Sequence, residues 1–215
     1  MKDYKAYLFD LDGTLVDSEK IKGKALVNTC KLFGAEVDVN TYKSVMGKSW
    51  IIVTDYFFTM AKIHPDIEEF NLKFRKIYQD LLFLELKPNP NIERYLQKLL
   101  EKKKRLGLVS SASSWMIDQV LIQLKLVDIF EVIITKEDVA DHKPNPEAYL
   151  SALEKLGLSG SDALVFEDSE AGLIAANKAN CDIVAFRHEF NKNHDLSLAN
   201  QSISDYGELF CIGGL

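Results

Sequence analysis

The sequence predicts an α/β fold in which a doubly wound parallel sheet is interrupted by one inserted helical segment. Short apolar runs alternate with stretches of helical periodicity, and this order favours parallel strands joined by helices. The expected strands are residues 7–9, 105–109, 132–134, 163–166 and 183–186. Because helix-like sequence fills the long gap after the first strand, the helical block is expected to be an insertion and not an N-terminal domain.

The insertion is expected to span residues 17–86, with the core formed by residues 1–16 and 87–215. Lysines alternate with apolar side chains at helical spacing from residue 18 to 34, and similar sequence continues to about residue 86. The segment from Lys87 to Asn91 contains two prolines, which disfavour helix and stiffen the connection, so we expect it to be the return hinge.

Composition excludes several classes of partner. The 215 residues are 47% hydrophobic, which is enough for a packed interior, and the net charge of -6 gives no general attraction to nucleic acid or anionic membranes. No stretch approaches the length of a membrane span. The three cysteines form no CxxC pair, a pattern typical of reduced thiols. We therefore expect a cytoplasmic protein, most simply a monomer, with neither a nucleic-acid nor a membrane partner.

Asp10 and Asp12 stand two residues apart at the end of the first expected strand, just before Gly13. In open α/β sheets, ligands bind at the carboxyl ends of the strands. An unpaired carboxylate beside an apolar strand is costly, so two of them suggest a cation, a reaction, or both. The alternative is that the two acids cap the next helix and the glycine makes the turn.

Polar residues follow three further strands. Ser110 and Ser111 come after the second strand, where hydroxyls and backbone N–H groups can bind an anion, although serines there more often cap helices. Lys143 lies in a loop that is stiffened by Pro144 and Pro146, just before an expected helix, and a fixed ammonium there can neutralise a phosphate or a carboxylate, although most lysines are solvated. Glu167 and Asp168 end the fourth strand, and Asp168 suits a hard cation. Parallel strands bring these residues to one edge of the sheet.

Four segments, FDLDGTLVDSE, LVSSAS, HKPNPEAY and FEDSEAG, resemble in order and spacing the four motifs of the haloacid dehalogenase-like (HAD) superfamily. Within that superfamily the chain is similar to the group with a C1 cap that contains β-phosphoglucomutase and sugar-phosphate phosphatases. The resemblance covers the whole chain. It implies a Rossmann-like core with an inserted helical C1 cap domain.

The resemblance also implies roles for the residues at the sheet edge. Asp10 would be the nucleophile that forms an aspartyl-phosphate, and Asp12 the general acid that protonates the leaving oxygen and then activates water. Ser110 and Lys143 would hold the phosphoryl oxygens, with Ser111 a weaker candidate. Phosphate ester cleavage needs proton delivery, whereas halide release needs none, and the family's dehalogenases lack the second aspartate. The presence of Asp12 therefore favours phosphoryl transfer over dehalogenation.

The implied cofactor is Mg²⁺. The resemblance implies that the Asp10 carboxylate, the Asp12 backbone carbonyl and Asp168 bind it, with Glu167 in the outer shell or joining directly and Ser169 a weaker candidate. A carboxylate nucleophile and a dianionic phosphate repel one another. Mg²⁺ and the lysine can together cancel this repulsion. Mg²⁺ prefers hard oxygen ligands, so two or three protein ligands plus substrate would suffice.

Specificity is expected to come from the cap. The loop around Gly47 and Lys48 resembles the substrate-facing loop of C1 caps, although a helix-breaking glycine beside a solvated lysine explains it as well. Aligned on the first motif and on Gly47, the cap histidine, lysine and arginine of the mutase fall at Lys22, Met46 and Trp50. All three positions depart from the mutase pattern.

We therefore expect a Mg²⁺-dependent phosphatase that hydrolyses a small phosphorylated metabolite, preferably a sugar phosphate. The alternatives are a phosphosugar mutase of the β-phosphoglucomutase type and a non-catalytic binding protein that keeps the HAD fold. The four histidines show no ligand spacing, and we expect no role for them. The polar sequence after residue 191 predicts no element.

Overall fold

The computed structural model of the chain describes residues 2–211, apart from the side chain of the last of these. The chain forms two compact units, Met1–Val16 with Pro88–Leu215, and Asp17–Lys87. We call them the core unit and the helical unit. The expected second boundary lay one residue earlier, between 86 and 87. Lys87 instead pairs with the other end of the helical unit, because its carbonyl accepts a hydrogen bond of 3.0 Å from the backbone N–H of Asp17.

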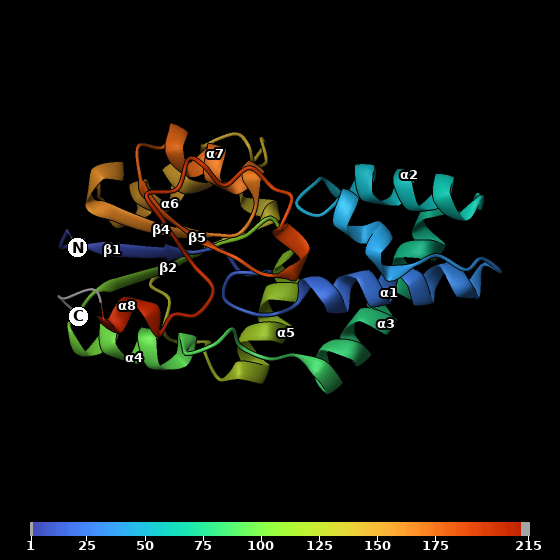
Figure 1. Cartoon of the computed structure of the whole chain (residues 1–215), viewed down its shortest axis with the longest axis horizontal. Coiled ribbons are helices and arrows are strands. Elements are labelled where there is room, and N and C mark those ends of the chain that lie inside the picture. Colours follow the sequence, from blue (N-terminus) through green and yellow to red (C-terminus); the bar gives the residue numbers. More distant parts are fainter. Residues whose placement is uncertain (1, 212–215) are drawn as a thin grey trace. The chain divides into compact units, whose positions relative to one another are not determined.

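The core unit is an α/β Rossmann-like fold built on a parallel sheet, as the sequence predicts. Six strands in the described residues pair in the order β3-β2-β1-β4-β5-β6, and every pairing is parallel. Figure 1 labels four of them, β1, β2, β4 and β5. Five of them lie at the predicted positions to within a residue, and β6 was not predicted. The strands are β1 (Ala6–Phe9), β2 (Arg105–Val109), β3 (Val132–Ile134), β4 (Ala163–Glu167), β5 (Asp182–Phe186) and β6 (Gln201–Ile203).

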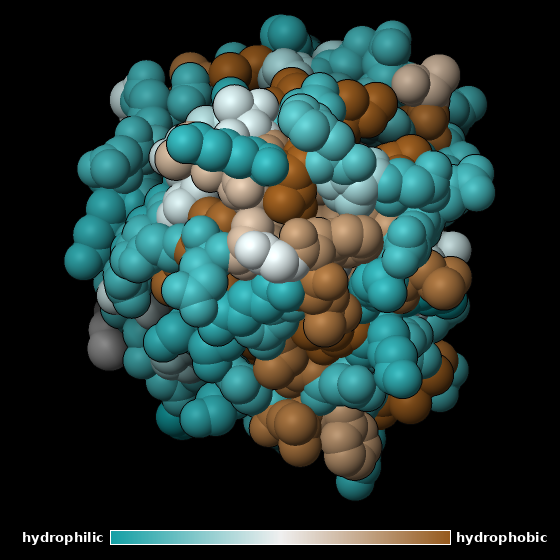
Figure 2. Space-filling view, turned by 90° about the vertical axis from the view of Figure 1, so that its right-hand side faces the viewer, coloured by the Kyte–Doolittle hydropathy of each residue, from teal (hydrophilic) through white to brown (hydrophobic). Residues whose placement is uncertain are grey.

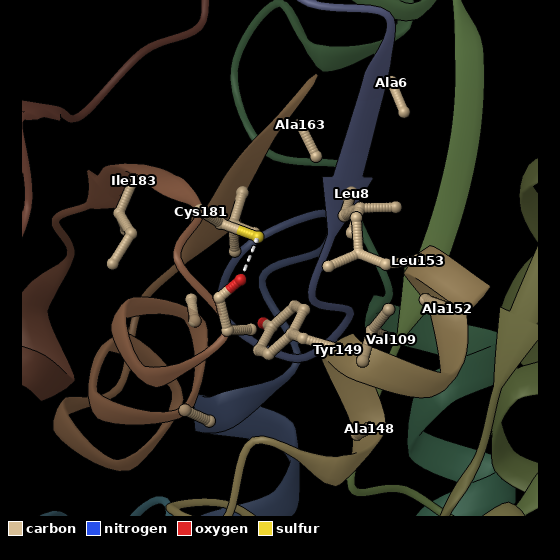
Figure 3. Packing of buried hydrophobic residues seen from close by; sticks show 14 of the residues in the cluster. Ala6, Leu8, Val109, Ala148, Tyr149, Ala152, Leu153, Ala163, Cys181 and Ile183 are labelled. Carbon is tan, nitrogen blue, oxygen red and sulfur yellow. Dashed lines mark hydrogen bonds between the residues drawn. The ribbon is translucent and has the colours of Figure 1, made fainter. Parts of the chain in front are cut away.

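Helices cover both faces of this sheet (Figure 1). On one face, Ala6 and Leu8 of β1 pack in a buried apolar cluster with residues of α6 and α7, and Figure 3 shows Leu8, Val109 and Tyr149 within it. Successive strand residues point to opposite faces, so Tyr7 and Phe9 belong to the other layer. The helices of the core unit are α4 (Ile92–Glu101), α5 (Ser114–Leu124), α6 (Glu147–Leu156), α7 (Glu170–Lys178) and α8 (Glu208–Cys211).

Aromatic rings fill the second layer. Phe9 and Phe166, from the paired strands β1 and β4, stack with ring centroids 4.7 Å apart. Tyr95 of α4 lies edge-on to both rings, and Tyr206 lies beside it at 5.5 Å. These buried rings pack against the last residues of β1 and β4, next to the carboxyl ends of the two central strands.

The strand order reverses between β1 and β4, which makes their carboxyl ends the topological switch point where ligands bind in such sheets. Phe9 is in register with Phe166, and the backbone N–H of Asp10 donates to the Phe166 carbonyl at 2.9 Å. Asp10 and Glu167 therefore leave the sheet side by side.

The helical unit contains α1 (Glu19–Leu32), the 3-10 helix η1 (Val39–Ser44), α2 (Trp50–Ala61) and α3 (Ile67–Glu85). Asp66 caps α3 by accepting a hydrogen bond of 2.9 Å from the backbone N–H of Glu69. The interior is apolar and aromatic, with Phe57 and Phe70 fully buried. This segment is all-helical, as its sequence predicts.

Apolar side chains also remain on the surface. Figure 2 shows several of them gathered on one face of the molecule. In the helical unit, the exposed large apolar side chains of α2 and α3 include Ile51, Ile52, Leu72, Phe83 and Leu84. None of the described helices has the length and apolar character that a bilayer span requires.

Candidate active site

The first part of the site is the turn that follows β1. Asp10 is the residue after the strand and is buried, because the neighbouring strands flank it. The turn is closed by a hydrogen bond of 2.8 Å from the Gly13 N–H to the Val16 carbonyl. The side-chain amide of Asn89 donates to the carbonyls of Gly13 at 2.9 Å and Thr14 at 2.7 Å. Asn89 therefore fixes the loop that carries Asp12. Asp12 itself is half-buried.

Lys143 reaches this turn from the loop before α6. Its Nζ atom lies 2.7 Å from Oδ1 of Asp10, 2.6 Å from Oε1 of Glu167 and 2.9 Å from the carbonyl of Val109. An ammonium has three donors, so these three acceptors satisfy it. The lysine side chain is only 5% exposed. Lys143 is thus a fixed positive charge between two carboxylates and not a solvated surface group.

Glu167 is fully buried and both of its carboxylate oxygens are occupied. Oε1 accepts hydrogen bonds from Lys143 and from the Tyr149 hydroxyl at 2.9 Å. Oε2 accepts from the backbone N–H groups of Asp168 and Ser169 at 3.0 and 3.2 Å, and from the Ser169 hydroxyl at 3.1 Å. Glu167 therefore orients Lys143 and the start of α7, and it has little capacity left for another ligand.

Gly172 makes room for that buried carboxylate. A Cβ atom at this position would lie 1.9 Å from the Glu167 carboxyl group, far inside van der Waals contact. The backbone N–H of Gly172 donates to the hydroxyl of Ser169, the N-cap of α7, at 3.0 Å. The glycine of the fourth motif thus serves close packing between the helix and the end of β4.

Asp168 completes a group of three buried carboxylates. Its Oδ2 lies 2.8 Å from Nε2 of His188, and its Oδ1 lies 3.5 Å from the Thr14 hydroxyl. One oxygen each from Asp10, Glu167 and Asp168 can be chosen so that all three lie within 4.8 Å of one another. Such a set of hard oxygen donors fits a divalent cation of the Mg²⁺ type.

The balance of charge at the site supports that fit. Three buried carboxylates lie near one lysine ammonium, which pairs with two of them, so the site carries excess negative charge when all three carboxylates are ionised. Burial raises the pKa of Asp10 above its ordinary value, the like charges of Glu167 and Asp168 raise it further, and Lys143 opposes them. Burial disfavours the charged form of Lys143, but Asp10 and Glu167 outweigh it and raise the pKa of the lysine. A second positive charge would relieve the excess.

The structure brings together only part of the predicted set. Asp10, Lys143, Glu167 and Asp168 are joined by the contacts described above. Ser110 is buried after β2, where its hydroxyl accepts a hydrogen bond of 3.0 Å from the backbone N–H of Ala112 and so shapes the loop before α5. Ser111 is exposed.

The remaining candidates lie in the helical unit. Lys22 forms an ion pair of 3.1 Å with Glu19 at the start of α1. Gly47 has a φ of 75°, a left-handed conformation that favours glycine, in the turn before α2. Lys48 is exposed beside it. Their roles in substrate binding stay a prediction.

Sequence reasoning missed four residues that surround the predicted set: Asn89, Tyr149, His188 and Asn191. Tyr149 lies within the third motif, six residues after Lys143. His188 follows β5 by two residues, so the rule that drew attention to the other strand ends also applied to it. The expectation that none of the histidines has a role overlooked the contact between His188 and Asp168. Asn89 and Asn191 carry no signal besides their type, because their contacts depend on the folded arrangement.

Comparison with known proteins shows which family the chain is similar to. Residues 7–186 match the family model described as "Haloacid dehalogenase-like hydrolase". A phosphoglycolate phosphatase of Aquifex aeolicus is 32% identical over 179 residues, which cover 81% of each chain. A phosphorylated carbohydrates phosphatase of Thermotoga maritima is 27% identical over 188 residues, 87% of each chain. The crystal structure of CbbY from Rhodobacter sphaeroides in complex with phosphate has the same fold, with a TM-score of 0.86, 23% identity, and coverage of 99% of this chain and 97% of the other.

Proposed function

The chain belongs to the haloacid dehalogenase-like hydrolase family, and on that premise we propose that it is a Mg²⁺-dependent phosphatase of a small phosphorylated metabolite, preferably a sugar phosphate. One observation carries the proposal: Lys143 lies between Asp10 and Glu167 at the switch point, with Asp168 beside them. The names of the two relatives, which act on phosphoglycolate and on phosphorylated carbohydrates, support the same substrate class.

In the proposed reaction, a carboxylate oxygen of Asp10 attacks phosphorus, and the bond between phosphorus and the ester oxygen breaks. Asp12 gives its proton to the departing oxygen. Water then attacks the aspartyl-phosphate, Asp12 takes up a proton from the water, and the bond between Asp10 and phosphorus breaks to release inorganic phosphate. The short spacing supports this division of roles, because both acids lie in one turn that Asn89 holds.

Lys143 and Ser110 are proposed to receive the phosphoryl oxygens, with Ser111 in a lesser role. A fixed ammonium at Asp10 lowers the repulsion between an anionic nucleophile and an anionic substrate. The three N–H donors of the ammonium are occupied by Asp10, Glu167 and Val109, so donation to a phosphoryl oxygen requires it to give up the contact with Asp10. Glu167 and Val109 keep the ammonium in place during that exchange.

The Asp10 and Asp168 carboxylates and the Asp12 carbonyl are proposed to hold Mg²⁺, which would supply positive charge opposite the phosphoryl oxygens. We place Glu167 in the outer shell. Its two oxygens already accept five hydrogen bonds, so it is better suited to orient Lys143 than to bind the metal directly. We place Ser169 in the outer shell as well, because its hydroxyl donates to Glu167 and accepts the hydrogen bond that caps α7.

The helical unit is proposed to be the C1 cap, with Gly47, Lys48 and Lys22 contributing to specificity. Two positions in this unit argue against a mutase, which must hold a second phosphate. Met46 is buried, and the indole N–H of Trp50 donates to Asn71 at 2.8 Å. Neither residue can supply the positive charge that the mutase has at the matching position.

Phosphate release from a panel of sugar phosphates and small acid phosphates, with and without Mg²⁺, tests the proposal. The panel includes β-glucose 1-phosphate, and glucose 6-phosphate formation is followed in parallel with a trace of glucose 1,6-bisphosphate. Metal-dependent free phosphate supports the phosphatase. Glucose 6-phosphate without free phosphate would establish the mutase instead. Binding of a phosphorylated ligand without any turnover would establish a binding protein.

Two variants test the assigned roles. Asp10→Asn and Asp12→Asn are each expected to lose turnover by orders of magnitude, the first through the nucleophile and the second through proton transfer. Circular dichroism checks that each variant is folded. Near-normal turnover in either would show that its role has been assigned to the wrong residue.

A further inference from the structure

We propose that His188 and Asn191 are positioning residues for the metal site: together they form a clamp that fixes the side chain and the backbone of Asp168 in the orientation that binds Mg²⁺. The inference rests on the proposed function, because it assumes that Asp168 is a metal ligand. It concerns the segment that follows β5, where the short 3-10 helix η4 (Glu189–Asn191) begins.

The hydrogen bonds of His188 determine which of its two ring nitrogens carries the proton. The backbone N–H of Phe190 donates to Nδ1 of His188 at 3.2 Å, so this ring nitrogen is an acceptor. In a neutral imidazole the other nitrogen then carries the proton. Nε2, at 2.8 Å from Oδ2 of Asp168, is therefore the donor in that contact. The turn thus presents an N–H group to one particular oxygen of the carboxylate.

Asn191 holds the backbone of the same aspartate. Its side-chain amide donates to the carbonyls of Asp168 at 2.9 Å and Phe186 at 2.7 Å. Its Oδ1 accepts a hydrogen bond of 2.9 Å from the backbone N–H of His188. Asn191 is only 1% exposed. Asn191 therefore connects the ends of β4 and β5 to the turn that carries the imidazole. Because Asn191 also contacts the backbone of His188, the two residues of the clamp stabilise one another.

Gly13 packs against this arrangement from the β1 turn. A Cβ atom there would lie 2.3 Å from Oδ2 of Asp168 and 2.9 Å from Nε2 of His188, and the residue has a φ of +79°. The glycine of the first motif thus leaves the space in which carboxylate and imidazole meet. The contact is enclosed on this side, which restricts the rotation of the Asp168 side chain.

Holding a metal-binding carboxylate in this way has a known consequence. Outer partners that orient a ligand commonly change metal affinity by about 10- to 100-fold when they are removed. For His188 the expected loss is in Mg²⁺ affinity itself and does not require substrate. It can therefore be measured apart from turnover.

Two substitutions at one position separate positioning from local structure. In His188→Asn, the amide oxygen can replace Nδ1 as the acceptor for the Phe190 N–H, but the side chain is too short to reach Asp168. In His188→Gln, the amide nitrogen can replace Nε2 as the donor to Asp168, but the acceptor for Phe190 is lost. If the clamp positions Asp168, the Asn variant is the impaired one. If His188 only stabilises its own turn, the Gln variant is impaired instead.

The experiment is calorimetric titration of the full chain with Mg²⁺ alone, for the wild type and both variants, with circular dichroism as the check on folding. We expect His188→Asn to raise the Mg²⁺ dissociation constant about 10-fold or more, and His188→Gln to keep it within about 3-fold. The rise in Tm on adding Mg²⁺ gives a second measure, because a ligand stabilises the state that binds it.

Unchanged affinity in His188→Asn would overturn the inference, and so would a larger loss in His188→Gln than in His188→Asn. Failure of the proposed function would look different. In that case the wild type itself would bind no Mg²⁺ in the millimolar range and would release no phosphate from the panel.

Discussion

Gly172→Ala tests the packing that holds the lysine at the site. In an ordinary helix this change stabilises by about 1 kcal/mol, because glycine is a poor helix former. Here the new Cβ would lie 1.9 Å from the Glu167 carboxyl group, whereas ordinary contact begins at 3.4 Å. The carboxyl group must therefore move by about 1.5 Å or the helix must shift. The clash therefore predicts that Gly172→Ala lowers the free energy of unfolding, whereas helix propensity alone predicts that it raises it.

The cost follows from the bonds that such a movement breaks. Glu167 accepts hydrogen bonds from Lys143, Tyr149, the Asp168 N–H, and the N–H and hydroxyl of Ser169. Hydrogen bonds to a charged group contribute roughly 1.5 to 3 kcal/mol each, so losing two costs about 3 to 6 kcal/mol. After the gain in helix propensity, we expect a net destabilisation of about 2 to 5 kcal/mol. For a chain of this size, the lower figure corresponds to a Tm decrease of about 4 to 8 °C.

Thermal and urea unfolding of the wild type and the variant measure this difference directly, and phosphate release shows whether Lys143 has lost its position. A matched comparison is Glu167→Gln, which keeps the size of the side chain but removes its charge. In either orientation of the amide, its NH2 group faces hydrogen-bond donors that the carboxylate now accepts from. Both variants are expected to lose stability and turnover together. A Gly172→Ala protein as stable as the wild type would refute the reasoning, because it would show that the carboxylate can move without cost.

Three further outcomes are expected. Tyr95→Phe should leave the free energy of unfolding unchanged or raise it by up to about 1 kcal/mol, since the hydroxyl is buried and has no hydrogen-bond partner among the described residues. A clear decrease of this free energy, measured by urea unfolding, would contradict the prediction. Burial raises the pKa of Cys30 to about 11 and that of Cys181 to about 12, so the native protein at pH 8 should keep both thiols unmodified by iodoacetamide, as peptide mass spectrometry can check; labelling before unfolding would show that one of them is accessible. Removing divalent cations with EDTA should abolish phosphate release and adding Mg²⁺ should restore it. Activity that survives chelation would contradict the metal-binding role proposed for Asp10 and Asp168.

The fold was largely predictable because its strands are short apolar runs at regular intervals. The strand β6 was missed because two of its three residues, Gln201 and Ser202, are polar and half-buried, so no apolar run marks this edge of the sheet. The sequence placed Asp10, Lys143 and Asp168 at one edge through the rule that parallel strands end together.

The partners of these residues were harder to predict. Glu167 was expected near the metal, but nothing in the sequence indicates that five hydrogen bonds occupy its oxygens. Asn89 and Asn191 are ordinary polar residues until the fold places their amides on the backbone carbonyls of distant loops. His188 also follows a strand end, but the histidines have no metal-ligand spacing in the sequence, so the sequence predicts no role for it. Its contact is with a carboxylate, and no spacing rule describes such a contact.

The way the helical unit is inserted has a consequence for how such a protein can change. Its first and last residues, Asp17 and Lys87, are joined by a backbone hydrogen bond, and the adjoining core residues Val16 and Pro88 pair in an isolated antiparallel bridge. The two ends of the insertion are therefore held next to one another, whatever sequence lies between them. We therefore expect that a segment of other length or composition can take its place without changing the register of β1 and β2. The architecture thus separates inheritance of the reaction chemistry from diversification of the inserted sequence.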